Sequence, residues 1–152
     1  MMTYNGINFL LSGNQTVKIP PTKLFTMINP KGKIKLNEEL YDLQEELEEN
    51  KKKLVALFDK IIDRYAVRKM EGDKVVTENG KTAYEMEDSI ENGKPIKRFK
   101  MEDREGYEKE IQELFDTKIE FKSKLSPGLL DGIELIGQVE YRWLRELDLL
   151  KK

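Results

Sequence analysis

Pairs of glutamates come nearest, in type and spacing, to a pattern that could do chemistry. Glu105 and Glu108 are three residues apart, as are Glu110 and Glu113, so each pair falls on one face of a helix. Such pairs form half of the di-metal carboxylate sites of helical bundles, whose other half is a Glu-x-x-His motif. The chain contains no histidine. We therefore expect a solvated helix face here, and we assign no catalytic residue, no metal ligand and no cofactor contact.

The composition removes most other routes to catalysis. The 152 residues include neither cysteine nor histidine, which excludes disulfides, thiolate nucleophiles, cysteine-ligated metals and the commonest general base. The sequence also has no phosphate-binding glycine loop, zinc-ligand spacing, nucleophile elbow or calcium loop. We therefore expect a protein that is not an enzyme. A magnesium-dependent carboxylate enzyme is the least favoured alternative.

Two neighbouring segments carry opposite charge. Residues 1–36 contain five lysines and no acid, whereas residues 37–49 contain seven acids and no base. A basic arm can contact nucleic acid, but this one has no arginine and little aromatic interleaving, so we expect the acidic helix to offset its charge. The acids could also imitate a phosphate backbone, although acids are ordinary in the first turns of a helix. The lysines are Lys18, Lys23, Lys31, Lys33 and Lys35.

The sequence shows no membrane or export signal. No stretch approaches the roughly 18 apolar residues of a spanning helix, and the first residues lack the basic start and apolar run of a signal peptide. We therefore expect a soluble cytoplasmic protein that does not contact a membrane.

A long amphipathic helix is the clearest predicted element. Asn37 is a good N-cap, and no glycine or proline occurs from there to Met70. The pattern predicts a helix over residues 38–69, roughly 48 Å long at about 1.5 Å per residue. Its apolar stripe recurs at spacings of three and four and consists of Leu40, Leu43, Leu47, Leu54, Leu57 and Ile61.

A polar residue interrupts this stripe, because Asn50 stands between Leu47 and Leu54. A buried asparagine at a core position fixes register and oligomeric state in two-stranded coiled coils. The stripe from Leu43 to Leu54, with Asn50 in it, is therefore a candidate surface for a symmetric homodimer. In the alternative, a monomer, a C-terminal helix covers the stripe and Asn50 reaches solvent.

The N-terminal arm, residues 1–36, is predicted to hold short strands and one short helix. Asn5-Gly6 and Gly13-Asn14 are turn signals on either side of the apolar segment 7–11. Residues 16–19 alternate and end at two prolines, which is typical of a short strand. Pro21 suits the first position of a helix. Residues 29–32 are a turn signal, and residues 33–36 alternate again as an extended segment.

Residues 70–101 are predicted to form hairpins, because Asn79-Gly80 and Asn92-Gly93 are both typical of two-residue type I′ turns. Five of the resulting cross-strand pairs join opposite charges, which favours the pairing. We expect a projecting β-meander with 82–91 as its middle strand; a mobile loop is the alternative. The predicted pairs are Glu78–Lys81, Val75–Tyr84, Lys74–Glu85, Glu91–Lys94, Asp88–Lys97, Glu87–Arg98 and Met86–Phe99.

Residues 103–150 are predicted to form two helices. Asp103 can cap the first, over 104–115, and residues 117–122 then alternate like a strand. Ser126-Pro127 is typical of a helix start, and apolar residues recur at helical spacing up to Leu150, which predicts a second helix over 127–149. Glu140 occupies a position where this stripe should be apolar.

Tyr141, Arg142 and Trp143 are a second candidate interaction surface, since these three residue types are enriched at binding hot spots. Trp143 falls on the apolar stripe, so we expect it in the core. Tyr141 and Arg142 point away from the stripe and are better placed to contact a partner.

Together the elements predict one α+β domain over residues 1–152, mainly α, in which long antiparallel helices pack together and a small β-meander projects. The pattern in Leu40–Tyr65, Asn79-Gly80 and Tyr107–Leu114 with Ile119 resembles a family of small proteins of unknown function encoded by tailed phages and prophages of Gram-positive bacteria. The resemblance covers about residues 16–147.

The family has no established activity, so the resemblance implies only a context, an accessory protein in the cytoplasm of a bacterial host cell. We expect a non-catalytic phage protein that acts by protein–protein interaction, in virion assembly or in modulation of a host system. The alternative is a phage protein that associates with nucleic acid through its lysine-rich N-terminal arm.

Overall fold

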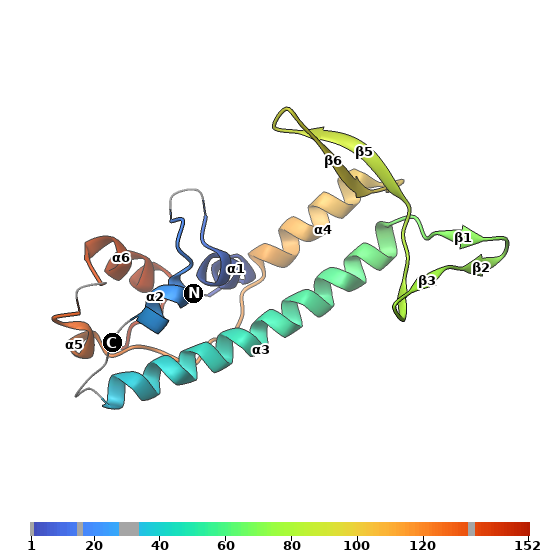
Figure 1. Cartoon of the computed structure of the whole chain (residues 1–152). Helices are drawn as coiled ribbons and strands as arrows, with labels where there is room; N and C mark the ends of the chain where they lie inside the picture. Colours follow the sequence, from blue (N-terminus) through green and yellow to red (C-terminus); the bar gives the residue numbers. More distant parts are fainter. Residues whose placement is uncertain (1, 15–16, 28–33, 134–135) are drawn as a thin grey trace. The chain divides into compact units, whose positions relative to one another are not determined.

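The computed structural model describes residues 2–14, 17–27, 34–133 and 136–152 (Figure 1). It is mainly helical, with 52% of the described residues in helices, and has small antiparallel two-stranded sheets. This confirms the predicted mainly α, α+β class. The chain divides into two compact units, Met1–Val55 with Leu114–Lys152 and Ala56–Glu113, called unit 1 and unit 2 below. The prediction of a single domain is left untested.

Unit 1 is a cluster of helices around one hydrophobic core. Its helices are α1 (Tyr4–Ser12), α2 (Pro21–Met27), the first part of α3 (Ile34–Tyr65), α5 (Pro127–Leu130) and α6 (Gln138–Glu146). Each helix supplies apolar side chains to the core, and so does the segment after α6. The fully buried members include Ile7, Leu10, Leu36, Leu43, Leu47, Leu125, Leu144 and Leu149.

The N-terminal segment is helical, and the predicted turn at Asn5-Gly6 is wrong. The hydroxyl of Thr3 caps α1 by accepting a hydrogen bond from the N–H of Gly6 at 3.2 Å. A Cβ on Gly6 would lie 2.8 Å from the sulfur of Met2 and 3.0 Å from Leu147. Glycine at this position therefore permits close packing inside a helix. The turn signal at Gly13 is real, because Gly13 ends α1 with a φ of 72°.

The short strands predicted on either side of α2 do not form among the described residues. Residues 17–20 are not in a strand, and Thr16 lies outside the described residues. Helix α2 begins at Pro21 as predicted. The turn predicted at 29–32, with Lys33, also lies outside the described residues. Residues 34–36 are helical rather than extended, because the buried stripe of α3 already begins at Leu36.

The C-terminal helix is broken in two, so the prediction of one helix over 127–149 is wrong. Gly132 has a left-handed φ of 79° between α5 and α6. The N–H of Gly137 donates to a carboxylate oxygen of Glu140 at 3.1 Å. Glu140 thus caps the start of α6 and does not interrupt an apolar stripe. The strand predicted at 117–122 is only an isolated bridge between Lys118 and Thr3.

Unit 2 contains three hairpins rather than a meander. They are β1–β2 (Met70–Glu71, Lys74–Val75), β3–β4 (Thr77–Glu78, Lys81–Thr82) and β5–β6 (Met86–Glu91, Lys94–Phe99). All four pairs predicted around Asn92-Gly93 are confirmed, as is Glu78–Lys81.

A third turn, at Gly72-Asp73, changes the register before β3. Gly72 has a φ of 64°, so Lys74 pairs with Glu71 and Val75 with Met70. The predicted pairs Val75–Tyr84 and Lys74–Glu85 and the middle strand 82–91 are therefore wrong, and Tyr84 instead bridges to Arg68.

Two closed rings of three backbone hydrogen bonds join the bases of these hairpins. In the first ring, Val67 donates to Lys100, Lys100 to Glu85 and Glu85 back to Val67, with N···O distances of 2.9, 2.9 and 2.8 Å. Each residue both donates and accepts, so the backbone stays paired where three chain segments converge. The second ring is built in the same way, with all three distances at 2.9 Å, from Lys69, Ala83 and Val76.

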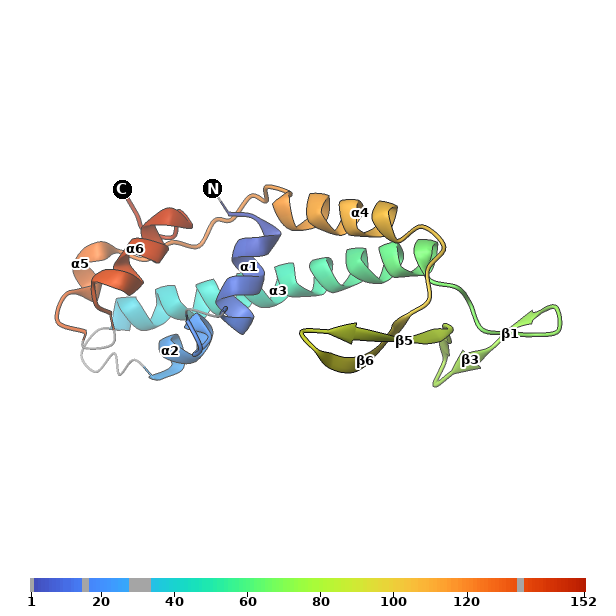
Figure 2. The same cartoon turned by 90° about the horizontal axis from the view of Figure 1, so that it is seen from above.

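Helix α4 (Arg104–Asp116) begins where the sequence predicts it, because the carboxylate of Asp103 accepts the N–H of Gly106 at 3.0 Å. In unit 2 its first turns run beside the last turns of α3 in the opposite direction (Figure 2). Tyr65 and Tyr107 meet edge to face with ring centres 6.1 Å apart. Arg64 of α3 and Glu110 of α4 form an ion pair at 2.9 Å, so the carboxylate of Glu110 links the two helices.

Candidate interaction site

Helix α6 is anchored by Trp143 and Leu144, which are both buried. The Trp143 ring lies 5.9 Å from the ring of Phe9 and 6.2 Å from that of Phe25, as measured between centres. These contacts confirm that Trp143 belongs to the core. They also fix the rotation of the helix, which leaves Arg142 exposed and Tyr141 half-buried on its other sides.

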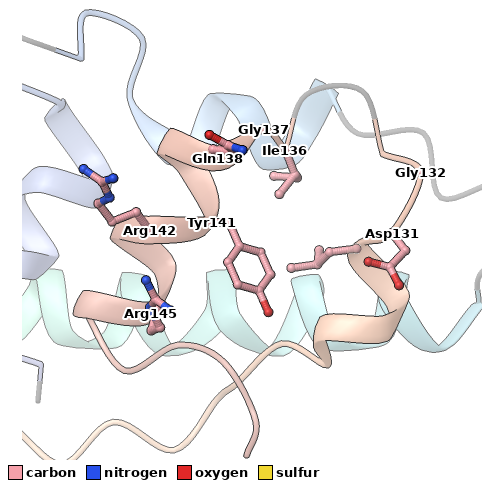
Figure 3. A pocket seen from close by; sticks show the side chains of 9 residues that line it. Asp131, Gly132, Ile136, Gly137, Gln138, Tyr141, Arg142 and Arg145 are labelled. Atoms are coloured by element: carbon pink, nitrogen blue, oxygen red, sulfur yellow. The ribbon is translucent and has the colours of Figure 1, made fainter.

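Tyr141 and Arg142 line a pocket of about 540 Å³ between α5 and α6, referred to below as the α6 pocket. Figure 3 shows the Tyr141 ring reaching from α6 into this space, toward the side that carries Asp131. The volume falls within the roughly 300–1,000 Å³ of ordinary ligand pockets. The lining residues are Leu130, Asp131, Gly132, Ile136, Gly137, Gln138, Tyr141, Arg142 and Arg145.

The α6 pocket carries more positive than negative charge. Arg142 and Arg145 are exposed, and neither forms an ion pair with any residue that the structure describes. Asp131 is the acidic side chain among the described lining residues, and it already has an interaction within the protein. Arg145 was missed by the sequence prediction, although its spacing of three from Arg142 places both on one side of a helix.

A second pocket, of about 680 Å³, lies between α1 and α6. Arg142 lines both pockets and so stands on the ridge between them. The α1 side of the second pocket presents Asn5 and Asn8, whereas the α6 side presents Val139 and Glu146. The exposed surface of α6 is therefore hollowed on two sides.

The other predicted surface, the leucine stripe of α3, is inside the protein. Leu43 and Leu47 have no exposed area, Leu54 is 8% exposed and Asn50 is 7% exposed. The amide of Asn50 donates to the carbonyl of Glu46 in its own helix at 2.9 Å. Leu43 and Leu47 belong to the core of one chain rather than to its surface. The oligomeric state itself remains a prediction.

Two carboxylates of the acidic segment hold the chain before α5 in place. Glu46 accepts hydrogen bonds from the backbone N–H groups of Lys122 and Ser123, the shortest at 2.7 and 2.8 Å. Glu39, two turns earlier on α3, accepts hydrogen bonds from both the backbone N–H and the hydroxyl of Ser126. These contacts join residues 76 to 87 positions apart. The remaining acids of the segment are exposed and comprise Glu38, Asp42, Glu45, Glu48 and Glu49.

The structure describes three of the five lysines in the predicted basic arm. Lys18, Lys23 and Lys35 are exposed, and Lys31 and Lys33 lie outside the described residues. Lys35 belongs to α3, the acidic helix itself. Nucleic-acid association through this arm therefore remains a prediction.

Within the described ranges, no group of three or more acidic side chains is arranged to hold a metal ion. None of the described helices has the length and apolar character needed to cross a membrane. Comparison with known proteins found no match among protein-family models, curated proteins or solved structures. The resemblance to the phage and prophage family thus remains a prediction.

Proposed function

We propose that this protein is a non-catalytic accessory protein of a phage or prophage that binds another protein in the bacterial cytoplasm. In this proposal it contributes to virion assembly or modulates a host system. The observation that carries the proposal is the α6 pocket, where Tyr141, Arg142 and Arg145 meet. The phage context comes from the sequence resemblance alone.

The composition of the α6 pocket supports protein binding. Tyrosine and arginine are the residue types that most often supply the energy of an interface. The two guanidinium groups have no ion-pair partner among the described residues, and each can donate two parallel hydrogen bonds to a carboxylate. Because Trp143 and Leu144 fix α6 in the core, the surface is largely formed before a partner arrives. Apolar floor residues such as Leu130 and Ile136 can hold a partner side chain.

Site-specific photocrosslinking tests this proposal. A photoreactive phenylalanine in place of Tyr141, in cells that naturally carry the gene, should crosslink to one defined protein that mass spectrometry identifies. The same residue in place of the exposed Lys109 on α4 is the control and should not yield that product. Adding Arg145→Glu should reduce the product at least tenfold. A yield at Tyr141 no higher than at Lys109, or one insensitive to Arg145→Glu, would contradict the proposal.

The alternative is association with nucleic acid through Lys18, Lys23 and Lys35, which are exposed. It predicts a mobility shift with DNA or RNA that weakens steeply with salt, because bound phosphates release counterions. Charge reversal of Lys18 and Lys23 should then weaken the shift, while Arg145→Glu should leave it unchanged. No shift at low salt would exclude the alternative.

A further inference from the structure

We infer that the α6 pocket binds the exposed acidic face of α3 in a second copy of this chain. The inference rests on the proposed function and names its partner. Both surfaces belong to unit 1, and they are separate, because no residue of α3 lines the pocket in the described part of the chain. One chain therefore offers both halves of a contact that two chains can make.

The acidic face is a single stripe along the side of α3 that points away from the core. Glu38, Tyr41, Glu45 and Glu48 follow one another at spacings of three and four, and all are exposed. The stripe is distinct from the buried stripe of Leu40, Leu43 and Leu47. It is thus an exposed side of this long helix that a partner can reach.

Tyr41 is the feature of the stripe that points to an interface. Tyr41 is 61% exposed although it is large and aromatic. The hydroxyl donates to a carboxylate oxygen of Glu45 at 2.8 Å, which holds the ring along the helix surface. An aromatic ring held in this way contributes contact area at low entropic cost. Exposed tyrosine among charged residues has the composition of a hot spot.

Charge and spacing of the two surfaces match. Arg142 and Arg145 are three residues apart on α6, and Glu45 and Glu48 are three residues apart on α3, so the Cβ atoms within each pair share a spacing of about 5–6 Å. Each guanidinium can therefore face one carboxylate. Tyr41 would then extend along the apolar part of the pocket, near Leu130 and Ile136.

The contact joins two different surfaces, so it is heterologous: in a pair of chains, one chain keeps a free acidic face and the other keeps a free pocket. Assemblies can therefore grow beyond a dimer, in contrast to the symmetric seam at Asn50. Charge pairs at a partly exposed contact are screened by salt, so association should weaken as the ionic strength rises.

Charge-swap sedimentation of the full chain tests the inference. Wild-type protein at low salt should sediment above 17.8 kDa as its concentration rises. Arg142→Glu with Arg145→Glu should weaken association at least tenfold, and so should Glu45→Arg with Glu48→Arg. An equimolar mixture of these two double variants should regain association, because one variant keeps the acidic stripe and the other keeps the basic pocket. Glu105→Arg with Glu108→Arg, two exposed acids three residues apart on α4, is the matched control and should behave as wild type.

The outcomes separate this inference from the proposed function. Wild-type protein that stays near 17.8 kDa at every concentration overturns the inference without the use of any variant. A mixture that fails to regain association, although circular dichroism shows both variants folded, also overturns it. If Tyr141 still crosslinks to a different protein in an Arg145-dependent manner, the proposed function stands with another partner. If that crosslink is absent as well, both the inference and the proposed function are wrong.

Discussion

The carboxylate of Glu39 accepts two hydrogen bonds from Ser126, one from its backbone N–H at 3.1 Å and one from its hydroxyl at 2.8 Å. The ammonium group of Lys151 lies 3.1 Å from the same carboxylate. Ser126 precedes α5, where the sequence suggests a helix cap, but its hydroxyl is used to bind α3 and makes no cap hydrogen bond. One buried carboxylate thus ties α3, the start of α5 and the C-terminal segment together.

The charge of Glu39 should therefore stabilise unit 1. Burial by itself raises the pKa of Glu39, but the hydrogen bonds from Ser126 and the charge of Lys151 outweigh it and hold the pKa below the usual 4.5. Glu39→Gln should lower the free energy of unfolding by about 1–3 kcal/mol at neutral pH, because a charge-assisted hydrogen-bond set is lost. Urea unfolding followed by circular dichroism measures the difference.

The pH dependence of this difference follows from the lowered pKa. A carboxylate with a depressed folded-state pKa stabilises the protein above its unfolded value of 4.5, and the effect disappears as the pH falls through the folded value. The gap between wild type and Glu39→Gln should thus be full at neutral pH and shrink in acid. Glu38→Gln, an exposed neighbour, is the control and should change stability by less than about 0.5 kcal/mol. A gap that persists unchanged in acid would refute the electrostatic explanation.

The hydrogen-bonded ring at the base of the hairpins should depend on the N–H of Glu85. Glu85→Pro removes the donor to Val67 and should destabilise unit 2 by about 1–3 kcal/mol. Amide hydrogen exchange should speed up at Val67 and Lys100 and stay unchanged in α6. Glu85→Ala keeps the N–H and loses only the solvent-exposed ion pair with Lys100, so exchange should stay close to wild type. Equal effects of both variants would show that the side chain, not the ring, matters.

The hairpins should be dispensable for unit 1. Val75 and Met86 are exposed, and Tyr84 packs against Phe99 and donates to Asp63 within unit 2. Replacing residues 74–98 by a short Gly-Ser linker should therefore leave the helical signal and the cooperative unfolding of unit 1 largely intact. A milder control replaces 88–97 by Asn-Gly and keeps both backbone rings. An insoluble or molten 74–98 variant would show that the hairpins support the main core.

The fold was predictable where the determinants are close in sequence. The β5–β6 register follows from Asn92-Gly93 and the charges beside it, and α4 from Asp103 and a local stripe. The predicted pairs Val75–Tyr84 and Lys74–Glu85 were wrong for two reasons. Tyr84 pairs with Arg68, sixteen positions away, and Gly72-Asp73 forms another turn. Glu71 opposite Lys74 was a signal that could have revealed that turn.

The candidate site also has features that the sequence predicts and features that it does not. Tyr141 and Arg142 were predictable because their position relative to Trp143 on a helix turns them out of the core. The pocket beside them was not predictable, since it depends on the break between α5 and α6. An apolar pattern that continues through Gly132 does not reveal that the backbone there adopts a left-handed φ. The roles of Glu39 and Glu46 depend on partners that only the folded chain brings near.

Asn50 offers a test of whether the leucine stripe is buried within one chain or forms a contact between two chains. Its side-chain amide donates a hydrogen bond to the carbonyl of Glu46. This carbonyl also accepts a backbone N–H within the helix, so Asn50→Leu leaves no polar group unpaired. The new side chain adds buried apolar surface beside Leu47 and Leu54, so the free energy of unfolding should rise by about 1 kcal/mol. Asn37→Leu, at an exposed position of the same helix, should bring no such gain. Sedimentation should show the same species before and after Asn50→Leu, because these leucines are covered from within the chain. A shift to larger species would instead support a symmetric seam at Asn50, where loss of the buried amide relaxes the choice of oligomeric state.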